Sequence, residues 1–250
     1  MTLEILTSSA LPVSHGFFTR KGGASSGVFE GLNCGPGSSD QRQAVTMNRV
    51  RVAEAMDAAP DKLVTIHQTH SADVVEVNSA FLEAPEADGM VSRVPGVVLG
   101  ILTADCMPVL FADTDAKVIG AAHAGWKGAK QGVLEATLAA MEDLGARRDR
   151  VAAVIGPAIS QRAYEVGPEF FDQFVEDDPG NTRYFSGGVG DRMQFDLISY
   201  GLGRLRAAGV GRSEWTGHCT YTDPKRFFSY RRSVHEKQAD YGRLISTIRL

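Results

Sequence analysis

The apolar positions of the chain form short continuous runs of a kind that is typical of buried strands. The clearest run covers 96–103, where no residue is charged. A turn at 113–115 separates two further runs, which predicts a hairpin. Together with shorter β-prone segments, these runs predict strands over 63–66, 73–77, 96–103, 108–112, 118–123, 151–155, 215–220 and 227–230.

Apolar residues recur with helical spacing in four other segments, most of which carry a residue suited to a helix end. Pro168 suits the first turn of one helix, while Gly145 and Gly209 follow the last turns of two others. The polar, Gly-rich segment 177–191 is predicted to be a loop. The spacing predicts helices over 41–57, 130–144, 168–175 and 197–208.

The order of these elements predicts an α+β fold with mixed β-sheets flanked by helices. Strands and helices alternate only loosely, and several neighbouring strands are separated by hairpin-sized gaps. The Gly-rich and Ser-rich stretch 16–39 could be an interdomain linker. Because Phe17, Phe18 and Phe29 lie in or beside it, a loop folded over a site is the better interpretation. We therefore expect residues 1–250 to form a single domain.

Composition and charge narrow the functional class. Charged residues make up 22% of the chain and the formal net charge is -4, which argues against a protein that binds nucleic acid. No apolar run approaches the roughly 20 residues that span a bilayer, so no membrane association is expected. The chain begins without the basic and apolar regions of a signal peptide. Three cysteines, an odd count, are typical of free thiols in a reducing compartment, so we expect a cytoplasmic enzyme.

Soft metal ligands lie in three segments that are far apart along the chain. His67 and His70 follow the β-prone run 63–66, Cys106 follows the apolar run 96–103, and His123 ends another run. One thiolate and two imidazoles would form a three-ligand zinc site, and catalytic zinc sites keep the fourth position open. His70 is favoured as the ligand of the first segment, because two histidines three residues apart share a metal only in a helix or tight turn.

The same residues allow two other interpretations. Cys106 could be a nucleophile with His123 as its base, as in cysteine hydrolases. Alternatively, Cys106 could be a small buried apolar residue, and the histidines could satisfy local backbone groups. Near the ligands, Asp73 and Asp105 could orient a ligand or act as a general base, and turn chemistry is an equally good interpretation of both.

Two cations stand beside glycines, where backbone N–H groups can also reach an anion. Arg20 precedes Lys21-Gly22-Gly23, and Lys127 lies between Trp126 and Gly128. Both are candidates for a phosphate contact, and a solvated turn is the alternative. Gln68, or His67, is expected to support the metal site or contact the substrate.

Several stretches together are similar to the YfiH-like family, also called the laccase-domain or multicopper polyphenol oxidase family. They occur in order along nearly the whole chain. The matching stretches are Thr19-Arg20-Lys21-Gly22-Gly23, His67-Gln68-Thr69-His70, Ala87-Asp88-Gly89-Met90, Ala104-Asp105-Cys106-Met107-Pro108-Val109, Ala122-His123-Ala124-Gly125-Trp126-Lys127-Gly128, Ile155-Gly156-Pro157-Ala158-Ile159, Tyr164-Glu165-Val166-Gly167 and Phe228-Ser229-Tyr230-Arg231-Arg232.

The resemblance implies a single α+β domain, like that of deamidating cysteine toxins, with zinc held by His70, Cys106 and His123. It also implies purine nucleoside chemistry: phosphorolysis of adenosine, inosine, guanosine or methylthioadenosine, and hydrolytic deamination of adenosine. Family members have also been labelled polyphenol oxidases and peptidoglycan editing factors. A true multicopper laccase is not expected, because six histidines are too few for several copper centres.

The leading hypothesis is a zinc-dependent enzyme that acts on purine nucleosides and phosphate. We expect His70, Cys106, His123 and Asp105 to be catalytic, and Arg20, Lys127 and Gln68 to bind substrate. The alternatives are an editing hydrolase that attacks a peptidoglycan precursor with Cys106 and His123, and a non-catalytic metal-binding protein. Nothing in the sequence indicates the oligomeric state.

Overall fold

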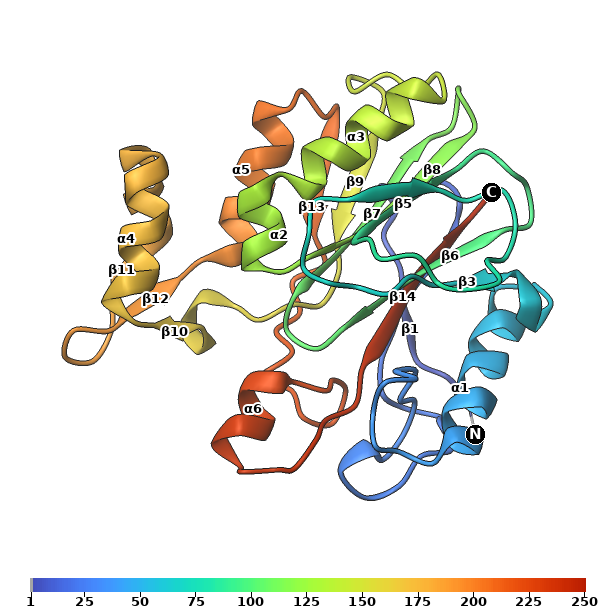
Figure 1. The fold of residues 1–250 in the computed structure, drawn as a ribbon, viewed down its shortest axis with the longest axis horizontal. Coiled ribbons are helices and arrows are strands. Elements are labelled where there is room, and N and C mark those ends of the chain that lie inside the picture. The colour runs from blue at the N-terminus through green and yellow to red at the C-terminus, as the bar shows by residue number, and fades with distance from the viewer. Residues whose placement is uncertain (1) are drawn as a thin grey trace.

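Two β-sheets stacked face to face form the centre of the molecule, and helices cover their outer faces (Figure 1). The computed structural model describes residues 2–250. Within these residues, no helix combines the length and the apolar character needed to cross a membrane. The α+β class expected from the sequence is confirmed.

The larger sheet has six strands in the order β13-β9-β7-β8-β5-β4 and mixes parallel and antiparallel pairs. Its centre is the β7–β8 hairpin, in which Pro108 pairs with His123 and Asp113 with Val118. The strands are β4 (Val74–Glu76), β5 (Gly89–Ser92), β7 (Met107–Asp113), β8 (Val118–Ala124), β9 (Ala152–Ile155) and β13 (Arg212–Trp215).

The second sheet has five strands in the order β1-β2-β14-β6-β3, so the C-terminal strand lies at its centre. Leu99 and Ile101 of this sheet pack against Leu110, Ile119 and Ala121 of the larger sheet in one apolar core. The strands are β1 (Ile5–Leu6), β2 (Ser14–Phe18), β3 (Leu63–Val64), β6 (Val98–Thr103) and β14 (Leu244–Arg249).

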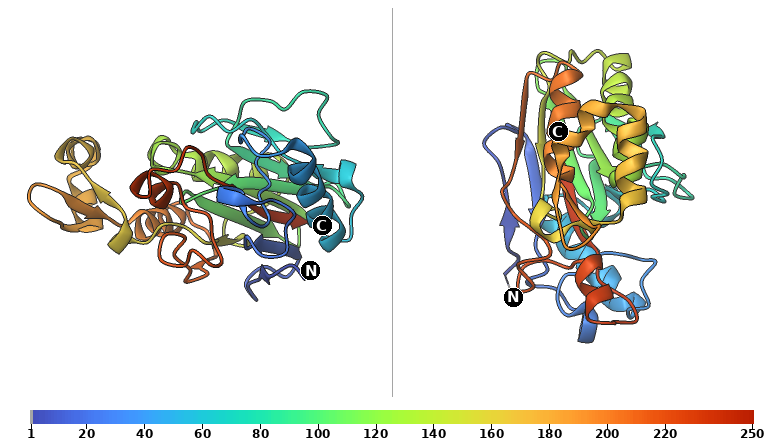
Figure 2. Two further views of the ribbon diagram at one scale, coloured as in Figure 1. Left: turned by 90° about the horizontal axis from the view of Figure 1, so that it is seen from below. Right: turned by 90° about the vertical axis from the view of Figure 1, so that its left-hand side faces the viewer.

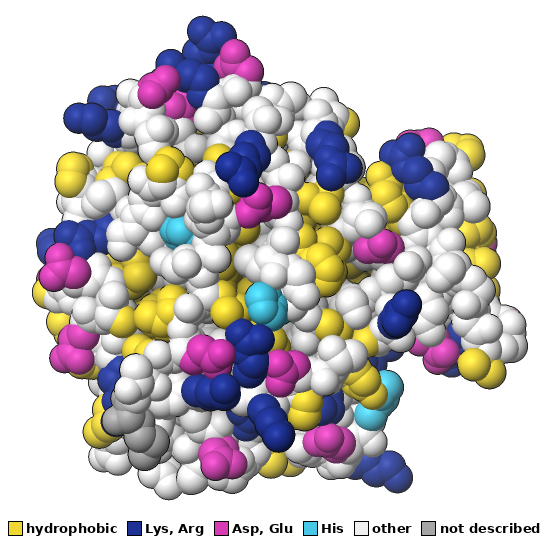
Figure 3. Space-filling model, turned by 180° about the vertical axis from the view of Figure 1, so that it is seen from behind, with side chains coloured by type: hydrophobic (Ala, Val, Ile, Leu, Met, Phe, Trp, Pro, Cys, Tyr) yellow, Lys and Arg dark blue, Asp and Glu magenta, His cyan; other side chains and the backbone are white. Residues whose placement is uncertain are grey.

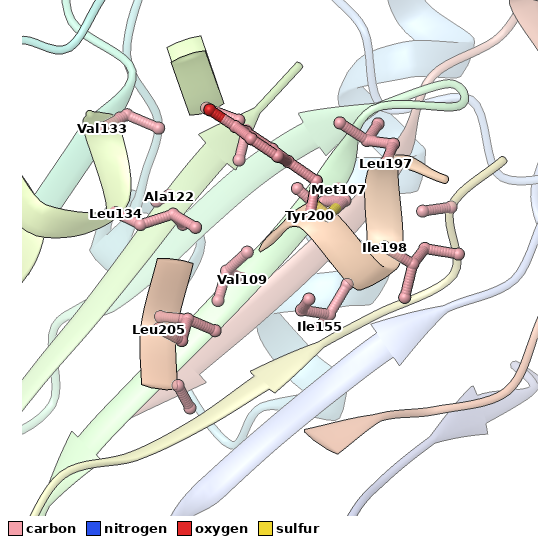
Figure 4. Close-up of a cluster of buried hydrophobic side chains, with 14 of the residues drawn as sticks. Met107, Val109, Ala122, Val133, Leu134, Ile155, Leu197, Ile198, Tyr200 and Leu205 are labelled. Carbon is pink, nitrogen blue, oxygen red and sulfur yellow. The ribbon is translucent and has the colours of Figure 1, made fainter. Parts of the chain in front are cut away.

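Helices cover the outer face of each sheet. The alternating residues of β7 that point away from the second sheet, such as Met107 and Val109, pack under α3 and α5 (Figure 4). On the other side, Val52 and Ala53 of α1 cover the five-stranded sheet. The α-helices are α1 (Arg42–Ala55), α2 (Trp126–Gln131), α3 (Val133–Asp143), α4 (Pro168–Asp177), α5 (Leu197–Ala207) and α6 (Tyr230–His235).

A lobe formed by α4 and a small three-stranded sheet stands away from the stacked sheets (Figures 1 and 2). Its strands are β10 (Glu165–Val166), β11 (Phe185–Gly187) and β12 (Met193–Phe195). Phe170, Phe174 and Phe195 lie ring against ring inside it. On the face shown in Figure 3 the lobe projects to one side, and basic and acidic side chains are interspersed over the surface.

The structure corrects several predicted elements. The helix expected over 130–144 is divided into α2 and α3 at Gly132, whose φ is +98°. The strand expected over 215–220 ends at its first residue, because Gly217 has a φ of +78° and turns the chain. Where a strand was expected over 227–230, the chain is irregular and then enters α6, which Ser229 caps by accepting a hydrogen bond from Arg232 N–H.

Other segments contain more regular structure than the sequence predicted. The expected loop 177–191 includes a 3₁₀ helix (Pro179–Tyr184) and β11. Strand β2 takes up the first residues of the Gly-rich stretch 16–39. No strand was predicted at β1, β5 or β14, although β14 lies at the centre of its sheet.

Candidate metal centre

Three soft ligands meet where β6 passes into β7. His70 lies in a turn after β3 with a φ of +62°, Cys106 directly precedes β7, and His123 lies near the end of β8. The Cys106 Sγ is 3.9 Å from His70 Nε2, and the ligand atoms of all three residues lie within 4.8 Å of one another. The β7–β8 register, which pairs Pro108 with His123, places Cys106 beside the His123 ring.

One buried carboxylate holds two of these ligands in place. Nδ1 of His123 donates to Oδ1 of Asp88 at 2.6 Å, so Nε2 is the ring nitrogen left for a metal. Oδ2 of Asp88 accepts from the backbone N–H of Thr69 at 3.0 Å and of Ser71 at 2.6 Å, on either side of His70. A carboxylate behind a ligating histidine fixes its tautomer and orientation. Asp88 therefore positions His123 directly and His70 through its turn.

These contacts shift the pKa values of the group. Burial acts to raise the pKa of Asp88, but hydrogen bonds from His123 and Ser71 N–H outweigh it and lower that pKa to about 2. Burial also acts to raise the pKa of the Cys106 thiol, but the charge of His123 outweighs this effect and lowers that pKa to about 6. The thiolate and Asp88 outweigh the burial of His123 and raise its pKa to about 9. Without a metal, Cys106 and His123 therefore form a thiolate–imidazolium pair at neutral pH.

The donor set and the space around it fit a transition metal such as zinc. In a tetrahedral zinc site, a sulfur and a nitrogen ligand lie roughly 3.6 Å apart, close to the 3.9 Å between Cys106 and His70. A Cβ at Gly125 would lie 2.9 Å from Cys106 Sγ and 2.9 Å from a His70 ring carbon, so this glycine leaves room for the ligands. Among residues 2–250, this is the one group of three such ligands.

Two clefts open on the cluster, and His70 and Cys106 line both of them. The larger, of about 570 Å³, is lined by both polar and apolar residues and includes 35–37 of the Gly-rich stretch. The smaller, of about 250 Å³, is lined by the aromatic residues Trp126, Tyr164 and Tyr230. Clefts of these sizes suit small-molecule ligands.

Gln68 and Asp105, predicted to bind substrate and to act in catalysis, both adjoin the clefts. The Gln68 amide donates to the Leu102 carbonyl at 2.8 Å and accepts from Leu102 N–H at 2.9 Å, so it anchors the first ligand segment to β6. Asp105 is buried with a φ of +89° and accepts from Thr220 Oγ1, Ser229 Oγ and Arg231 N–H. Burial raises its pKa despite these hydrogen bonds.

The two predicted phosphate ligands lie outside both clefts. Arg20 donates to the carbonyls of Glu30 and Pro224 and stacks on Phe228, and it lines separate cavities. Lys127 is exposed on α2, with its Nζ 5.5 Å from the centre of the Trp126 ring. Their contact with substrate stays a prediction. The far end of the Gly-rich stretch, at 35–37, does reach the larger cleft.

Sequence reasoning missed the role of Asp88. Asp88 lies in a stretch that carries the family resemblance, whereas the orienting groups expected from the sequence are Asp73, which is exposed, and Asp105. The signal that could have found it is an aspartate directly before a strand. Gly89, at the start of this strand β5, pairs with Ala122 next to His123, which brings Asp88 beside the His123 ring.

Comparisons with known proteins agree with this arrangement. The sequence model of the family described as "Multi-copper polyphenol oxidoreductase laccase" matches residues 14–250. The chain is 41% identical over 236 residues to a protein of Deinococcus radiodurans named purine nucleoside phosphorylase, covering 93% of this chain and 88% of that one. It is 38% identical to Escherichia coli "Purine nucleoside phosphorylase YfiH", covering 86% of each chain.

Solved structures show the same fold. A Neisseria meningitidis protein superposes with a TM-score of 0.89 at 34% identity and covers 100% of this chain and 99% of its own. YlmD from Geobacillus stearothermophilus superposes with a TM-score of 0.85 at 28% identity, covering 94% of this chain and 90% of its own. The chain therefore belongs to the YfiH-like family, the family expected from its sequence.

Proposed function

We propose that the protein is a zinc-dependent enzyme that phosphorolyses purine nucleosides, with phosphate as the second substrate. The observation that carries the proposal is the cluster of His70, Cys106 and His123, which borders two ligand-sized clefts: all three residues line the larger one, and His70 and Cys106 also line the smaller. Relatives at 38–41% identity that carry the name purine nucleoside phosphorylase support the reaction class. With one three-ligand cluster among residues 2–250, a multicopper oxidase chemistry has no second site to use.

The chain's own residues account for much of the proposed chemistry. His70, Cys106 and His123 would hold the ion, and Asp88 keeps His123 Nε2 turned toward it. A bound zinc ion is a Lewis acid that polarises an oxygen ligand and stabilises developing negative charge. The aromatic rings of the smaller cleft suit the flat face of a purine. We assign Asp105 a positioning role, since its carboxylate is occupied by the segment that carries Tyr230.

A specific observation favours one second candidate, a cysteine hydrolase. In the metal-free protein, Cys106, His123 and Asp88 stand in the order of a nucleophile, its base and the group that orients the base. Such a site could attack an amide of a peptidoglycan precursor. Alkylation of Cys106 by iodoacetamide in the presence of zinc separates the two candidates. A metal-bound thiolate is shielded from the reagent, whereas a free nucleophile reacts with it.

Incubation of the zinc-loaded protein with adenosine or inosine, with and without phosphate, tests the proposal. Phosphorolysis releases free base and ribose 1-phosphate only when phosphate is present. Conversion of adenosine to inosine would instead show deamination, the other reaction that the resemblance to the YfiH-like family implies. If neither nucleoside turns over and a peptidoglycan precursor does, the hydrolase candidate replaces the phosphorylase.

A further inference from the structure

A single arginine is held rigidly on the wall of the larger cleft. Arg243, just before β14, lines this cleft together with all three metal ligands. Its Nη1 donates to Asp240 Oδ1 at 3.1 Å and to the Tyr241 carbonyl at 2.7 Å. The guanidinium lies 4.0 Å from the centre of the Tyr241 ring. These contacts fix the plane and the direction of the guanidinium.

The fixed guanidinium leaves one edge free. Both protein acceptors are bound by Nη1, and within residues 2–250 neither Nε nor Nη2 has a hydrogen-bond partner. Neither nitrogen is among the buried unpaired polar atoms, and 23% of the Arg243 side chain is exposed. Nε–H and Nη2–H together form the edge that binds two oxygens of one carboxylate or phosphate.

The surrounding backbone supports this arrangement. A Cβ on Gly35 would lie 2.6 Å from Arg243 Cδ, so a glycine is needed where the arginine stem passes. Asp240 Oδ2 accepts from Ser39 N–H at 2.7 Å and from Ser39 Oγ at 3.0 Å, which ties the Gly-rich loop to the same aspartate. Asp240 therefore holds Arg243 with one oxygen and the cleft rim with the other.

We propose that Arg243 is the oxyanion anchor of the larger cleft and binds the inorganic phosphate that enters the reaction. This inference rests on the proposed phosphorolysis, which needs a phosphate site close to the metal ligands. Phosphate on Arg243 would lie in the larger cleft and a purine among the rings of the smaller one, and His70 and Cys106 border both clefts. This division matches a displacement in which phosphate forms a bond to the anomeric carbon of the sugar as the bond from that carbon to the base breaks.

Two variants of the full chain test the anchor. Arg243→Lys keeps a cation and a long stem but loses the two-nitrogen edge. Gly35→Ala keeps the arginine and displaces its stem. We expect each to raise the KM for phosphate about ten-fold or more while the KM for the nucleoside stays within about two-fold.

The matched control is Arg249→Lys. Arg249 lies at the end of the same β14, has the same 23% side-chain exposure, and likewise pairs with an aspartate, Asp57, and with backbone carbonyls. It lines neither cleft that opens on the metal ligands. The control should leave both KM values unchanged. An unchanged phosphate KM in Arg243→Lys and in a folded Gly35→Ala protein would overturn the assignment.

A binding measurement separates failure of the anchor from failure of the proposed function. Inorganic phosphate is titrated with protein and followed by the width of its ³¹P resonance, at constant ionic strength. Broadening with the unmodified protein and its loss in Arg243→Lys support the anchor, even if no nucleoside is cleaved. Equal broadening in both proteins contradicts it, even if phosphorolysis is observed. Acetate that displaces phosphate at equal concentration would contradict the choice of phosphate over a carboxylate ligand.

Discussion

Among single residues, Asp88 has the widest influence on the metal centre, because it contacts His123 and both sides of the His70 turn. Asp88→Asn keeps the shape of the side chain but removes its charge and one strong acceptor. We expect zinc affinity to fall about 10-fold to 100-fold, the range found when such supporting carboxylates are lost. Competition between the protein and a chelator of known affinity measures the change.

Asp73→Asn is the control for this substitution, since Asp73 is exposed and lies three residues after the ligand His70. Its zinc affinity should equal that of the unmodified protein. Equal affinities in all three proteins would show that Asp88 serves folding alone.

The thiol of Cys106 should titrate well below an ordinary cysteine. Its folded pKa is lowered to about 6 and that of His123 is raised to about 9. In metal-free protein the thiolate therefore forms as the pH rises through about 6, and the ion pair persists until His123 loses its proton near 9. Alkylation of Cys106 by iodoacetamide, followed by peptide mass spectrometry, should be half-maximal near pH 6. A midpoint near 8.5, the ordinary value, would contradict the thiolate–imidazolium pair.

Residue types together with the family resemblance predicted the cluster of His70, Cys106 and His123 but not its supports. His70, Cys106 and His123 were recognisable because few side chains bind soft metals and all three follow apolar runs. Asp88 and Arg243 were not recognisable in this way. Asp88 meets His123 through the pairing of β5 with β8, and Arg243 is held at the cleft because Gly35 leaves room for its stem and Asp240 binds its guanidinium.

Among the elements, α6 depends on a contact with the cysteine segment. Asp105 accepts from Thr220, Ser229 and Arg231 and so joins the residue before Cys106 to the start of that helix. Asp105→Ala should lower the free energy of unfolding by about 2–4 kcal/mol, since three hydrogen bonds to a buried carboxyl group are lost. Denaturant unfolding measures this loss.

The conservative change Asp105→Asn distinguishes a positioning residue from a general base. An amide retains an acceptor for Arg231 N–H and can hydrogen-bond to both hydroxyls. Base release at saturating nucleoside should therefore remain within about ten-fold of the unmodified protein, with an unchanged pH profile. If Asp105→Asn instead loses as much of the rate of purine release as Asp105→Ala does, and one limb of its pH profile disappears, Asp105 acts as a general base.

Gly125, the residue before α2, leaves the space that Cys106 and His70 need to bind a metal ion. Gly125 caps this helix with a φ of -67°, which alanine also adopts, but its Cβ would press on Cys106 and His70. Gly125→Ala should weaken zinc binding with little change in metal-free stability. In Gly187→Ala, where a Cβ meets nothing within 4 Å, zinc affinity should not change. Equal zinc affinities in the two variants would mean that the ligands do not need the space.

Elements with long apolar runs were predicted well, and those defined by tertiary contacts were not. The strands β7 and β8 are uncharged over most of their length and buried throughout, so their sequence is distinctive. The unpredicted strand β5 is short and begins with glycine, and the unpredicted β1 extends over two residues only. At 227–230 the aromatic residues suggested a strand, but Phe228 is buried under Arg20 and Ser229 caps a helix instead.

At the scale of the whole molecule, the stacking of the two sheets assembles the site. The ligands come from the turn after β3, the β6–β7 junction and β8, while Arg243 precedes β14. Strands β6 and β14 pair along their length, which brings the C-terminal segment beside the metal ligands. No local sequence pattern predicts this arrangement, because the segments that meet at the site are far apart along the chain.

Titration of zinc into metal-free protein, with phosphate and inosine present, tests the central claim most directly. The measured quantity is the rate of base release against equivalents of zinc per chain. We predict no release without metal, a linear rise, and saturation at one equivalent, because His70, Cys106 and His123 form one site. Full base release before any zinc is added, with bound metal shown to be absent by elemental analysis, would contradict the account.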